Sequence, residues 1–292
     1  MAARARLLGH NVPIAEIDHP NEVATTFANA LPVLPLTTPL QAKPGVATPS
    51  DAPGVIEAIT RSVDLVRQRA ASAVVTLPIN KKSLYDAGFS HPGHTEFLGE
   101  LARDWPGHDG AVRPVMLLAG PSLMAVPITV HIPLKDVAAH LSADLIVETA
   151  HIVAADLKKR IGIKRPRLAF SGLNPHAGEG GALGREDLEI IAPALERLRA
   201  DGVDCLGPLP ADTMFHAAAR QRYDVALCMY HDQALIPVKA LGFDEAVNVT
   251  LGLPFVRTSP DHGTAFDIAG TGKASPSSFI AALKMARKMV ST

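Results

Sequence analysis

The sequence predicts an α/β protein in which a parallel or mostly parallel sheet is covered on both faces by helices. Short apolar runs alternate with amphipathic helical patterns along most of the chain, which is the arrangement of strands buried on both faces. The 292 residues are 47% hydrophobic and 20% charged. This composition supplies a sizeable core and too little charge for disorder. The length is compatible with one large unit or two smaller lobes.

Five apolar runs are predicted to be strands because each is short and is bounded by turn or polar residues. The runs are 71–78, 114–119, 125–130, 167–172 and 224–230.

Three long helices are predicted from their boundary residues. They occupy 142–162, 184–202 and 275–290. Ser142 and Ser275 are placed to cap the first and last of these helices, and Pro276 follows at a first helical position. Acidic residues crowd the first turn of the middle helix. Gly162 and Gly202 are placed to end the first two helices.

The overall composition excludes several classes of partner. Lys and Arg number 28 against 29 Asp and Glu, and aromatic residues make up 4%, so neither a basic nucleic-acid surface nor a base-stacking platform is expected. No apolar stretch approaches the ~20 residues of a membrane span. The basic start lacks the apolar region of a signal peptide. Cys205 and Cys228 lie in apolar runs, as do reduced core thiols, so a cytoplasmic protein is expected.

The standard phosphate-binding loops are absent from the sequence. Gly178 and Gly180 fit the first two glycines of a dinucleotide fingerprint, but Leu183 stands at the third. A phosphate loop that ends at Gly272 requires a glycine where Asp267 stands. A dinucleotide would therefore bind in another way.

Three of the predicted strands are each followed by a histidine, namely His131, His176 and His231. Ligands of such folds bind at the carboxyl ends of the strands, and imidazole binds zinc, nickel, cobalt or iron. The glycines around His176 allow a close approach of the backbone to a ligand. The alternative is three unrelated loop histidines, because the chain has twelve and their spacing is no motif.

Other polar residues also have two interpretations. Thr95 either caps a helix or, with His94, forms an anion site at the helix start. Lys239 is a solvated helix residue or a ligand. Arg257 lies in a mostly apolar stretch, where an unpaired guanidinium is costly, so we expect a carboxylate or an anionic ligand beside it. The segment 258–275 is a long turn or a loop that approaches a ligand.

Six segments together resemble the 4-hydroxythreonine-4-phosphate dehydrogenase family of pyridoxal phosphate biosynthesis. They are PGHTEFL, HIPLKD, GLNPHAGEGG, GPLPADTMF, MYHDQALIPVK and VNVTLGLPFVRTSPDHGTAFDIAG. The resemblance runs from about Ala71 to the C-terminus and is weaker but collinear before it. In addition, DHGTAFDIAGTGKAS resembles the adenosine-binding segment of isocitrate and isopropylmalate dehydrogenases.

The resemblance implies a two-lobed α/β/α sandwich of the isocitrate/isopropylmalate dehydrogenase type. By analogy, residues 1–88 with 245–292 form a terminal lobe that carries the cofactor segment. Residues 89–244 then form a central lobe with the metal ligands and the dimer contacts. The family resemblance also implies a homodimer with the site at the interface and metal histidines drawn from both subunits.

The resemblance further assigns candidate roles to individual residues. The metal ligands are His131, His176 and His231. The substrate-binding residues are His94, Thr95, Lys239, Asn248 and Arg257, and the candidates for moving the hydroxyl proton are Lys239 and Asp212. The cofactor-binding residues are His262, Gly263, Thr264, Ala265 and Asp267.

The activity that the resemblance implies is the oxidation and decarboxylation of 4-phosphooxy-L-threonine. It uses NAD or NADP and one divalent ion, zinc, magnesium or cobalt. The alternatives are a paralogous dehydrogenase of 4-phospho-D-threonate, 4-phospho-erythronate or a dihydrodiol, and a truncated form that binds ligands without turnover.

Family members carry a segment of the form G-[DE]-P-A-G-I-G-P-[DE] ahead of the region where this sequence begins. A sheet without that strand exposes an edge. We therefore expect the chain as written to be less stable than a version extended upstream.

Overall fold

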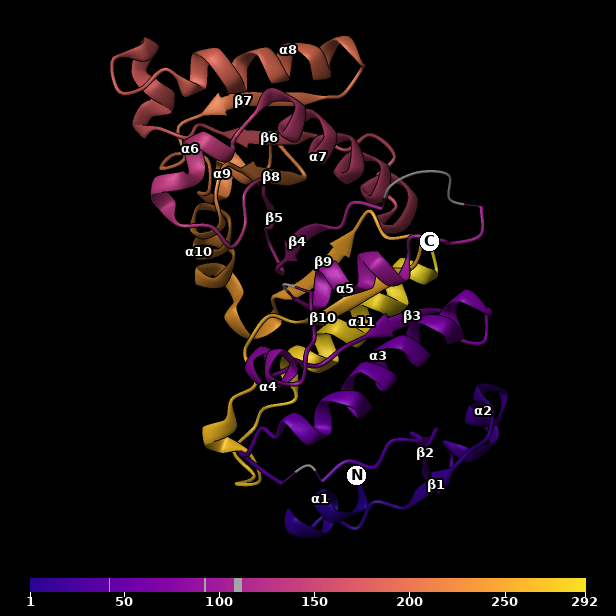
Figure 1. Ribbon diagram of the computed structural model, residues 1–292. Helices are drawn as coiled ribbons and strands as arrows, with labels where there is room; N and C mark the ends of the chain where they lie inside the picture. Colours follow the sequence, from indigo (N-terminus) through magenta and orange to yellow (C-terminus); the bar gives the residue numbers. More distant parts are fainter. Residues whose placement is uncertain (42, 92, 108–111) are drawn as a thin grey trace. The chain divides into compact units, whose positions relative to one another are not determined.

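The computed structural model describes residues 1–41, 43–91, 93–107 and 112–292 (Figure 1). The chain divides into two compact units. Unit 1 comprises Met1–Val112 and His262–Pro276, and unit 2 comprises Arg113–Asp261 and Ser277–Thr292. Ala42 of the Pro-rich stretch 31–54 and Pro92 of the PGHTEFL segment lie outside the described residues.

Unit 2 is built on a sheet whose strands follow the order β10-β9-β4-β5-β8-β6-β7. The strands are β4 (Val115–Ala119), β5 (Met124–Pro127), β6 (Leu168–Ser171), β7 (Cys205–Leu209), β8 (Val225–Cys228), β9 (Val247–Leu251) and β10 (Val256–Pro260). β6 and β8 are buried along their whole length, as expected for strands covered on both faces. The α/β class and four of the five predicted strands are thus found in this unit.

The expectation of a mostly parallel sheet is wrong for one half of unit 2. β5 pairs with β8, β8 with β6 and β6 with β7 in parallel. In contrast, β4 runs antiparallel to both β5 and β9, and β9 antiparallel to β10. The amide of Gly120 donates to the carbonyl of Leu123 at 2.9 Å. A turn this short joins only antiparallel neighbours, which accounts for the mixed sheet.

Helices flank this sheet. They are α6 (Val137–His140), α7 (Ala143–Asp156), α8 (Ala192–Ala200), α9 (Ala217–Arg220), α10 (His231–Gly242) and α11 (Ser277–Val290), with short helical segments η3 (Leu134–Asp136), η4 (Leu157–Ile161), η5 (Pro175–Gly181), η6 (Asp187–Ile191) and η7 (Phe243–Glu245). Figure 1 shows α8 alongside β7 at one end of the sheet and α11 alongside β10 at the other.

The predicted helix boundaries of unit 2 are largely confirmed. The hydroxyl of Ser142 accepts a hydrogen bond from the Leu145 amide at 3.2 Å, as an N-cap residue does. Gly162 and Gly202 have positive φ, +83° and +81°, where the helices end, because glycine adopts this conformation without a Cβ penalty. The last helix begins at Ser277, one residue after the predicted start.

Unit 1 contains α1 (Ala2–Leu7), β1 (Ile14–Glu16), η1 (Pro20–Glu22), α2 (Val23–Thr26), β2 (Leu31–Val33), η2 (Pro49–Asp51), α3 (Ala52–Arg67), β3 (Ala73–Val75), α4 (Lys81–Asp86), α5 (His94–Leu101) and η8 (Phe266–Ile268). β1 and β2 pair in parallel. β3 lies within 71–78, the one predicted strand that is not in unit 2.

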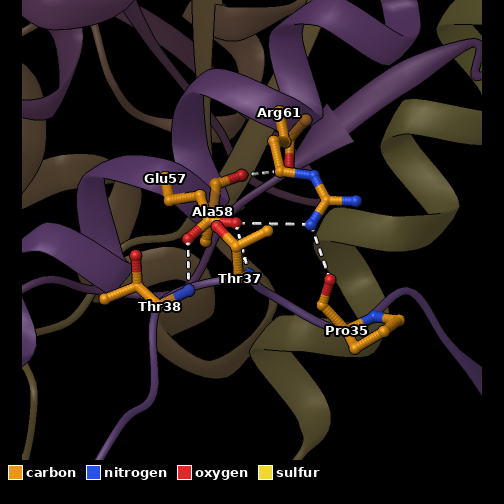
Figure 2. A network of polar contacts seen from close by, with 7 residues as sticks. Pro35, Thr37, Thr38, Glu57, Ala58 and Arg61 are labelled. Carbon is orange, nitrogen blue, oxygen red and sulfur yellow. Dashed lines mark hydrogen bonds and ion pairs between the residues drawn. The ribbon is translucent and has the colours of Figure 1, made fainter.

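The Pro-rich stretch of unit 1 is fastened to α3 by one carboxylate (Figure 2). The amides of Thr37 and Thr38 donate to Glu57 at 2.7 and 2.8 Å, and Arg61 donates to the carbonyl of Pro35 at 2.6 Å. The hydrogen bonds from Thr37 and then Thr38 lower the pKa of Glu57 to about 2. The stretch therefore has defined anchors although most of it is irregular.

The boundaries of the two units differ from those of the lobes that the resemblance implies. The expected lobes are 1–88 with 245–292 and 89–244. β9 pairs with β10 on one side and with β4 on the other, so contacts place both β9 and β10 in unit 2. The lobe assignment itself stays a prediction.

Both cysteines, Cys205 and Cys228, are buried free thiols. In the part of the chain that the structure describes, no single helix is long and apolar enough to cross a membrane. One bent pair of helices, Leu134–His140 with Ala143–Ile161, is long and apolar enough for a membrane span by length and composition alone.

Candidate functional site

The three histidine loops leave the same edge of the unit 2 sheet. β5, β8 and β6 are neighbours and run parallel, so their carboxyl ends lie together. His131 follows β5, His231 follows β8 as the first residue of α10, and His176 follows β6. Asp212 follows β7, the parallel neighbour of β6, and is exposed. Four of the predicted site residues thus belong to one edge.

Hydrogen bonds that continue beyond the strands bring two of these histidines together. The hydroxyl of Thr129 donates to the carbonyl of Met229 at 2.7 Å. Two residues further along each segment, the rings of His131 and His231 lie with their centroids 5.7 Å apart. The sheet itself therefore sets the separation of the two imidazoles.

The pair lines an open cavity of about 230 Å³, whose other walls include Tyr230 and the apolar side chains of Val130 and Leu134. Nδ1 of His231 lies 2.7 Å from a carboxylate oxygen of Asp232. A carboxylate at one ring nitrogen orients an imidazole and leaves Nε2 for another ligand.

His176 lies in a stretch of left-handed backbone. Its φ is +53°, and every residue from His176 to Gly181 has positive φ. Three of these six are not glycine, His176, Ala177 and Glu179, and each costs roughly 1–2 kcal/mol in this conformation. Nδ1 of His176 lies 3.5 Å from a carboxylate oxygen of Glu179, and the histidine side chain is 63% exposed. Strain of this kind is retained where the surrounding structure enforces it, often at functional sites.

Within one chain, the site supplies some of the ligands that a divalent ion needs, but not all of them. Imidazole nitrogens and an orienting carboxylate are the ligands and the support that zinc or cobalt use. Among the residues placed in the structure, no three His, Cys, Asp or Glu side chains are grouped closely enough to hold a metal. His131 and His231 come together, whereas the ring of His176 lies beside the carboxylate of Glu179.

Gln233, which the sequence did not single out, ties together the two strand ends that precede His176 and His231. Its Oε1 accepts from the Ser171 hydroxyl at 2.7 Å and from the Met229 amide at 2.8 Å, and its Nε2 donates to the Gly172 carbonyl at 2.8 Å. No sequence signal distinguishes this glutamine from an ordinary residue of a helix first turn.

The predicted substrate residues of unit 2 lie on two elements. In the register of β9 and β10, Asn248 faces Ser259 and Arg257 faces Thr250, so Asn248 and Arg257 share one face. Arg257 is 4% exposed and donates to the Thr250 hydroxyl at 3.0 Å. Burial lowers the pKa of Arg257 to about 10. The anion expected beside Arg257 stays a prediction.

Lys239 belongs to α10 and is half-buried. Its ammonium lies 2.8 Å from a carboxylate oxygen of Asp261 and 5.7 Å from the centroid of the Phe243 ring. Asp261, which the sequence interpretation did not include, therefore sets the direction of the Lys239 side chain.

The predicted residues of unit 1 lie at a helix start and in a loop. α5 begins at His94 with Gly93 as its N-cap residue, so the interpretation of Thr95 as the cap is wrong. Thr95 lies inside the first turn because the helix begins two residues earlier than a cap at Thr95 requires.

The cofactor segment, His262, Gly263, Thr264, Ala265 and Asp267, occupies a loop of unit 1 and the short helix η8 that follows it. Ala265 has φ +46°, and Nδ1 of His262 lies 2.9 Å from the Gly263 carbonyl oxygen. Thr264 lines a cavity of about 180 Å³ with Thr48 and Asn80.

Comparison with known proteins gives consistent results. The profile of the family described as pyridoxal phosphate biosynthetic protein PdxA matches residues 1–286. The chain is 58% identical over 285 residues to a 4-hydroxythreonine-4-phosphate dehydrogenase of Bradyrhizobium diazoefficiens, covering 97% of this chain and 81% of that protein. It is 52% identical over 281 residues to a protein of the same name from Caulobacter vibrioides, covering 96% and 84%.

Solved structures agree with the sequence relatives. The 4-hydroxythreonine-4-phosphate dehydrogenase of Klebsiella pneumoniae superposes with a TM-score of 0.85 at 37% identity, covering 98% of this chain and 86% of that one. A terephthalate 1,2-cis-dihydrodiol dehydrogenase of Burkholderia xenovorans gives 0.64 at 26% identity, covering 95% and 83%. The chain therefore belongs to the PdxA family of pyridoxal phosphate biosynthetic proteins.

Proposed function

We propose that the protein is a dehydrogenase that oxidises and decarboxylates 4-phosphooxy-L-threonine with NAD or NADP and a divalent ion. The observation that carries the proposal is the convergence of the His131, His176 and His231 loops at one edge of the sheet. The names of the relatives, 4-hydroxythreonine-4-phosphate dehydrogenase, support the substrate class. The proposed place of action is the cytoplasm.

His131 and His231 would hold the divalent ion, since their rings are neighbours and Asp232 orients one of them. When bound, the ion stabilises negative charge on the substrate hydroxyl oxygen and later on the carbonyl oxygen. Zinc, cobalt and magnesium are the candidates.

We propose that a second copy of the chain completes the site in a homodimer. His176 is 63% exposed and is thus accessible to a partner. Leu134, at the cavity, and Ile236, on α10, are 69% and 65% exposed, and apolar side chains of this size favour burial in an interface.

The anionic end of the substrate would be held by fixed cations and amides. Lys239 is directed by Asp261, and Arg257 and Asn248 share a face of the sheet. Arginine and lysine both bind phosphate, arginine as a planar fork. The first turn of α5, with His94 and Thr95, offers backbone amides.

The reaction needs a proton acceptor and a hydride acceptor. As the hydride leaves the carbinol carbon, the hydroxyl proton passes to the carboxylate of Asp212, or to Lys239 if that side chain acts as the free amine rather than as the cation paired with Asp261. The cofactor segment would hold NAD or NADP, which would supply the hydride acceptor, and the β-keto acid product would then lose CO2. The adenosine of the NAD or NADP would lie at the cofactor segment, where Thr264 borders a cavity of about 180 Å³.

The test is NADH formation from 4-phosphooxy-L-threonine before and after removal of metal with a chelator. We expect turnover to disappear on chelation, to return with zinc, cobalt or magnesium, and to be lost in His176→Ala. The matched control is His151→Ala, a half-exposed histidine paired with Asp201, which should retain activity. Turnover that ignores the chelator would refute the metal role.

A parallel panel with 4-phospho-D-threonate, 4-phospho-erythronate and a cis-dihydrodiol decides between related substrates. The likeness to a dihydrodiol dehydrogenase makes the last compound a necessary member. Higher kcat/KM on one of these substrates would replace the proposed substrate and leave the dehydrogenase class intact.

A further inference from the structure

We propose that Asp187 is the positioning residue of the site, because its buried carboxylate holds the loop that presents His176. The proposal rests on the proposed function for the role of His176, although the loop contacts are independent of it. Asp187 opens η6 and precedes α8, eleven positions beyond His176 in the chain.

The Asp187 carboxylate is fully buried and is the acceptor for the start of the loop. Its Oδ1 accepts from the Leu173 amide at 2.9 Å, and its Oδ2 accepts from the Asn174 amide at 3.2 Å and the Asn174 side chain at 3.0 Å. The same Asn174 nitrogen donates to Glu186 at 2.8 Å. Hydrogen bonds to an ionised acceptor are stronger than those between neutral groups, so this end of the loop is firmly fixed.

The glycines of the loop make room for this carboxylate. A Cβ atom at Gly172 would lie 2.6 Å from Oδ1 of Asp187, and one at Gly178 would lie 3.1 Å from Oδ2. At Gly184 a Cβ atom would meet the Asn174 side chain at 2.4 Å. The loop therefore closes around the Asp187 carboxylate from both sides of His176.

His176 and Ala177 lie between these two fixed points, Asn174 and Gly178. Their left-handed backbone, φ +53° at both, is unfavourable for non-glycine residues and requires enforcement by contacts outside the stretch. In the part of the chain that the structure describes, the Asp187 carboxylate accepts hydrogen bonds from Leu173 and Asn174 and none from the His176 ring, so Asp187 acts on His176 through the backbone of the loop. Groups that fix a metal ligand by a direct hydrogen bond are worth about 10- to 100-fold in metal affinity, and we expect a support that acts through the backbone to have an effect of the same order.

The experiment compares Asp187→Asn with the wild type in the full-length protein. Asparagine keeps the volume of the aspartate side chain but replaces one acceptor oxygen by an NH₂ group, which cannot accept from the amides of Leu173 and Asn174. Glu189→Gln is the matched control, because Glu189 is an exposed carboxylate of the same helical segment, paired with Arg185. One readout is amide hydrogen exchange in the metal-free protein, and the other is Co²⁺ titration followed by the visible absorption of the ion.

We expect Asp187→Asn to exchange the amides of 173–181 about tenfold faster and to weaken Co²⁺ binding by about 10- to 100-fold. Exchange in the strands β5 and β8 should stay unchanged. The Glu189→Gln variant should match the wild type in both readouts.

Unchanged exchange in the loop would overturn the proposal whatever the metal does. Faster exchange with unaltered Co²⁺ affinity would also overturn it, because Asp187 would then be structural only. If the wild type binds no Co²⁺, the proposed metal role fails separately, and the exchange data alone decide whether Asp187 holds the loop. Should Asp187→Asn fail to fold, Asn174→Ala removes one contact of the carboxylate and gives the same two readouts.

Discussion

Replacing Gln233 by leucine should destabilise unit 2 more than the same replacement of an exposed glutamine, because it breaks three hydrogen bonds at once. The partners are the Ser171 hydroxyl, the Met229 amide and the Gly172 carbonyl, at 2.7–2.8 Å. All three partner residues are buried, so water does not replace the lost side chain.

The magnitude follows from the number of bonds. Each contributes about 1 kcal/mol net, and a buried group left without its partner costs about 1–3 kcal/mol. The free energy of unfolding should therefore fall by about 3 kcal/mol or more, a large share of the ~5–15 kcal/mol typical of a protein. Urea unfolding monitored by circular dichroism measures the change, and Gln221→Leu, an exposed position in the same unit, is the control. A loss below about 1 kcal/mol in Gln233→Leu would refute the reasoning.

Gln233→Glu refines the same test. Glutamate keeps an acceptor for Ser171 and Met229 but turns an oxygen toward the Gly172 carbonyl, which disfavours its ionised form. Its pKa in the folded state should rise above the unfolded value of about 4.3. The deficit relative to the wild type is then full at neutral pH and shrinks as the pH falls below the folded pKa. A deficit independent of pH would contradict the assigned hydrogen-bond directions.

Three further predictions concern other parts of the chain. Glu57→Gln should lower the melting temperature near neutral pH, and the difference should vanish as the pH falls from 4.5 to about 2, because the wild-type pKa is lowered from 4.5 to about 2; a difference that persists at the lowest pH would contradict this. Gly178→Ala should cost at least ~1–2 kcal/mol in urea unfolding, because φ is +79° and the new Cβ would lie 2.9 Å from the Gly184 carbonyl oxygen; a neutral effect would contradict the left-handed conformation. Arg160→Met should cost about 3–5 kcal/mol in the same assay, because it leaves Asp156 without its buried partner; a cost near zero would contradict the buried ion pair.

Much of the fold was predictable because its strands are continuously apolar and its helices carry clear boundary residues. Ser142 and Gly162 mark a helix that forms almost as expected. β9 and β10 were not predicted, because buried polar residues such as Thr250 and Arg257 interrupt their apolar pattern. The antiparallel part of the sheet escaped prediction because β9 and β10 were missed and because the short turn between β4 and β5, closed by the Gly120–Leu123 hydrogen bond, was not recognised.

The candidate site was predictable only in its outline. The position of His131, His176 and His231 after strands placed them at one edge, and the structure brings the first and third together. Asp187 and Gln233 gave no signal, because their role lies in contacts across the fold. In the sequence Asp187 is one of several acids in a helix first turn, whereas in the structure it is buried against the preceding loop.

The most direct test of the central claim is Co²⁺ titration of the metal-free wild type and of the variants His131→Ala, His176→Ala and His231→Ala, with His151→Ala as the control. We expect one Co²⁺ per chain in the wild type and in the control, with a visible spectrum typical of imidazole ligands, and a large loss of affinity in each of the three other variants. Equal Co²⁺ affinity in all five proteins would contradict the claim that the three histidine loops form a metal site.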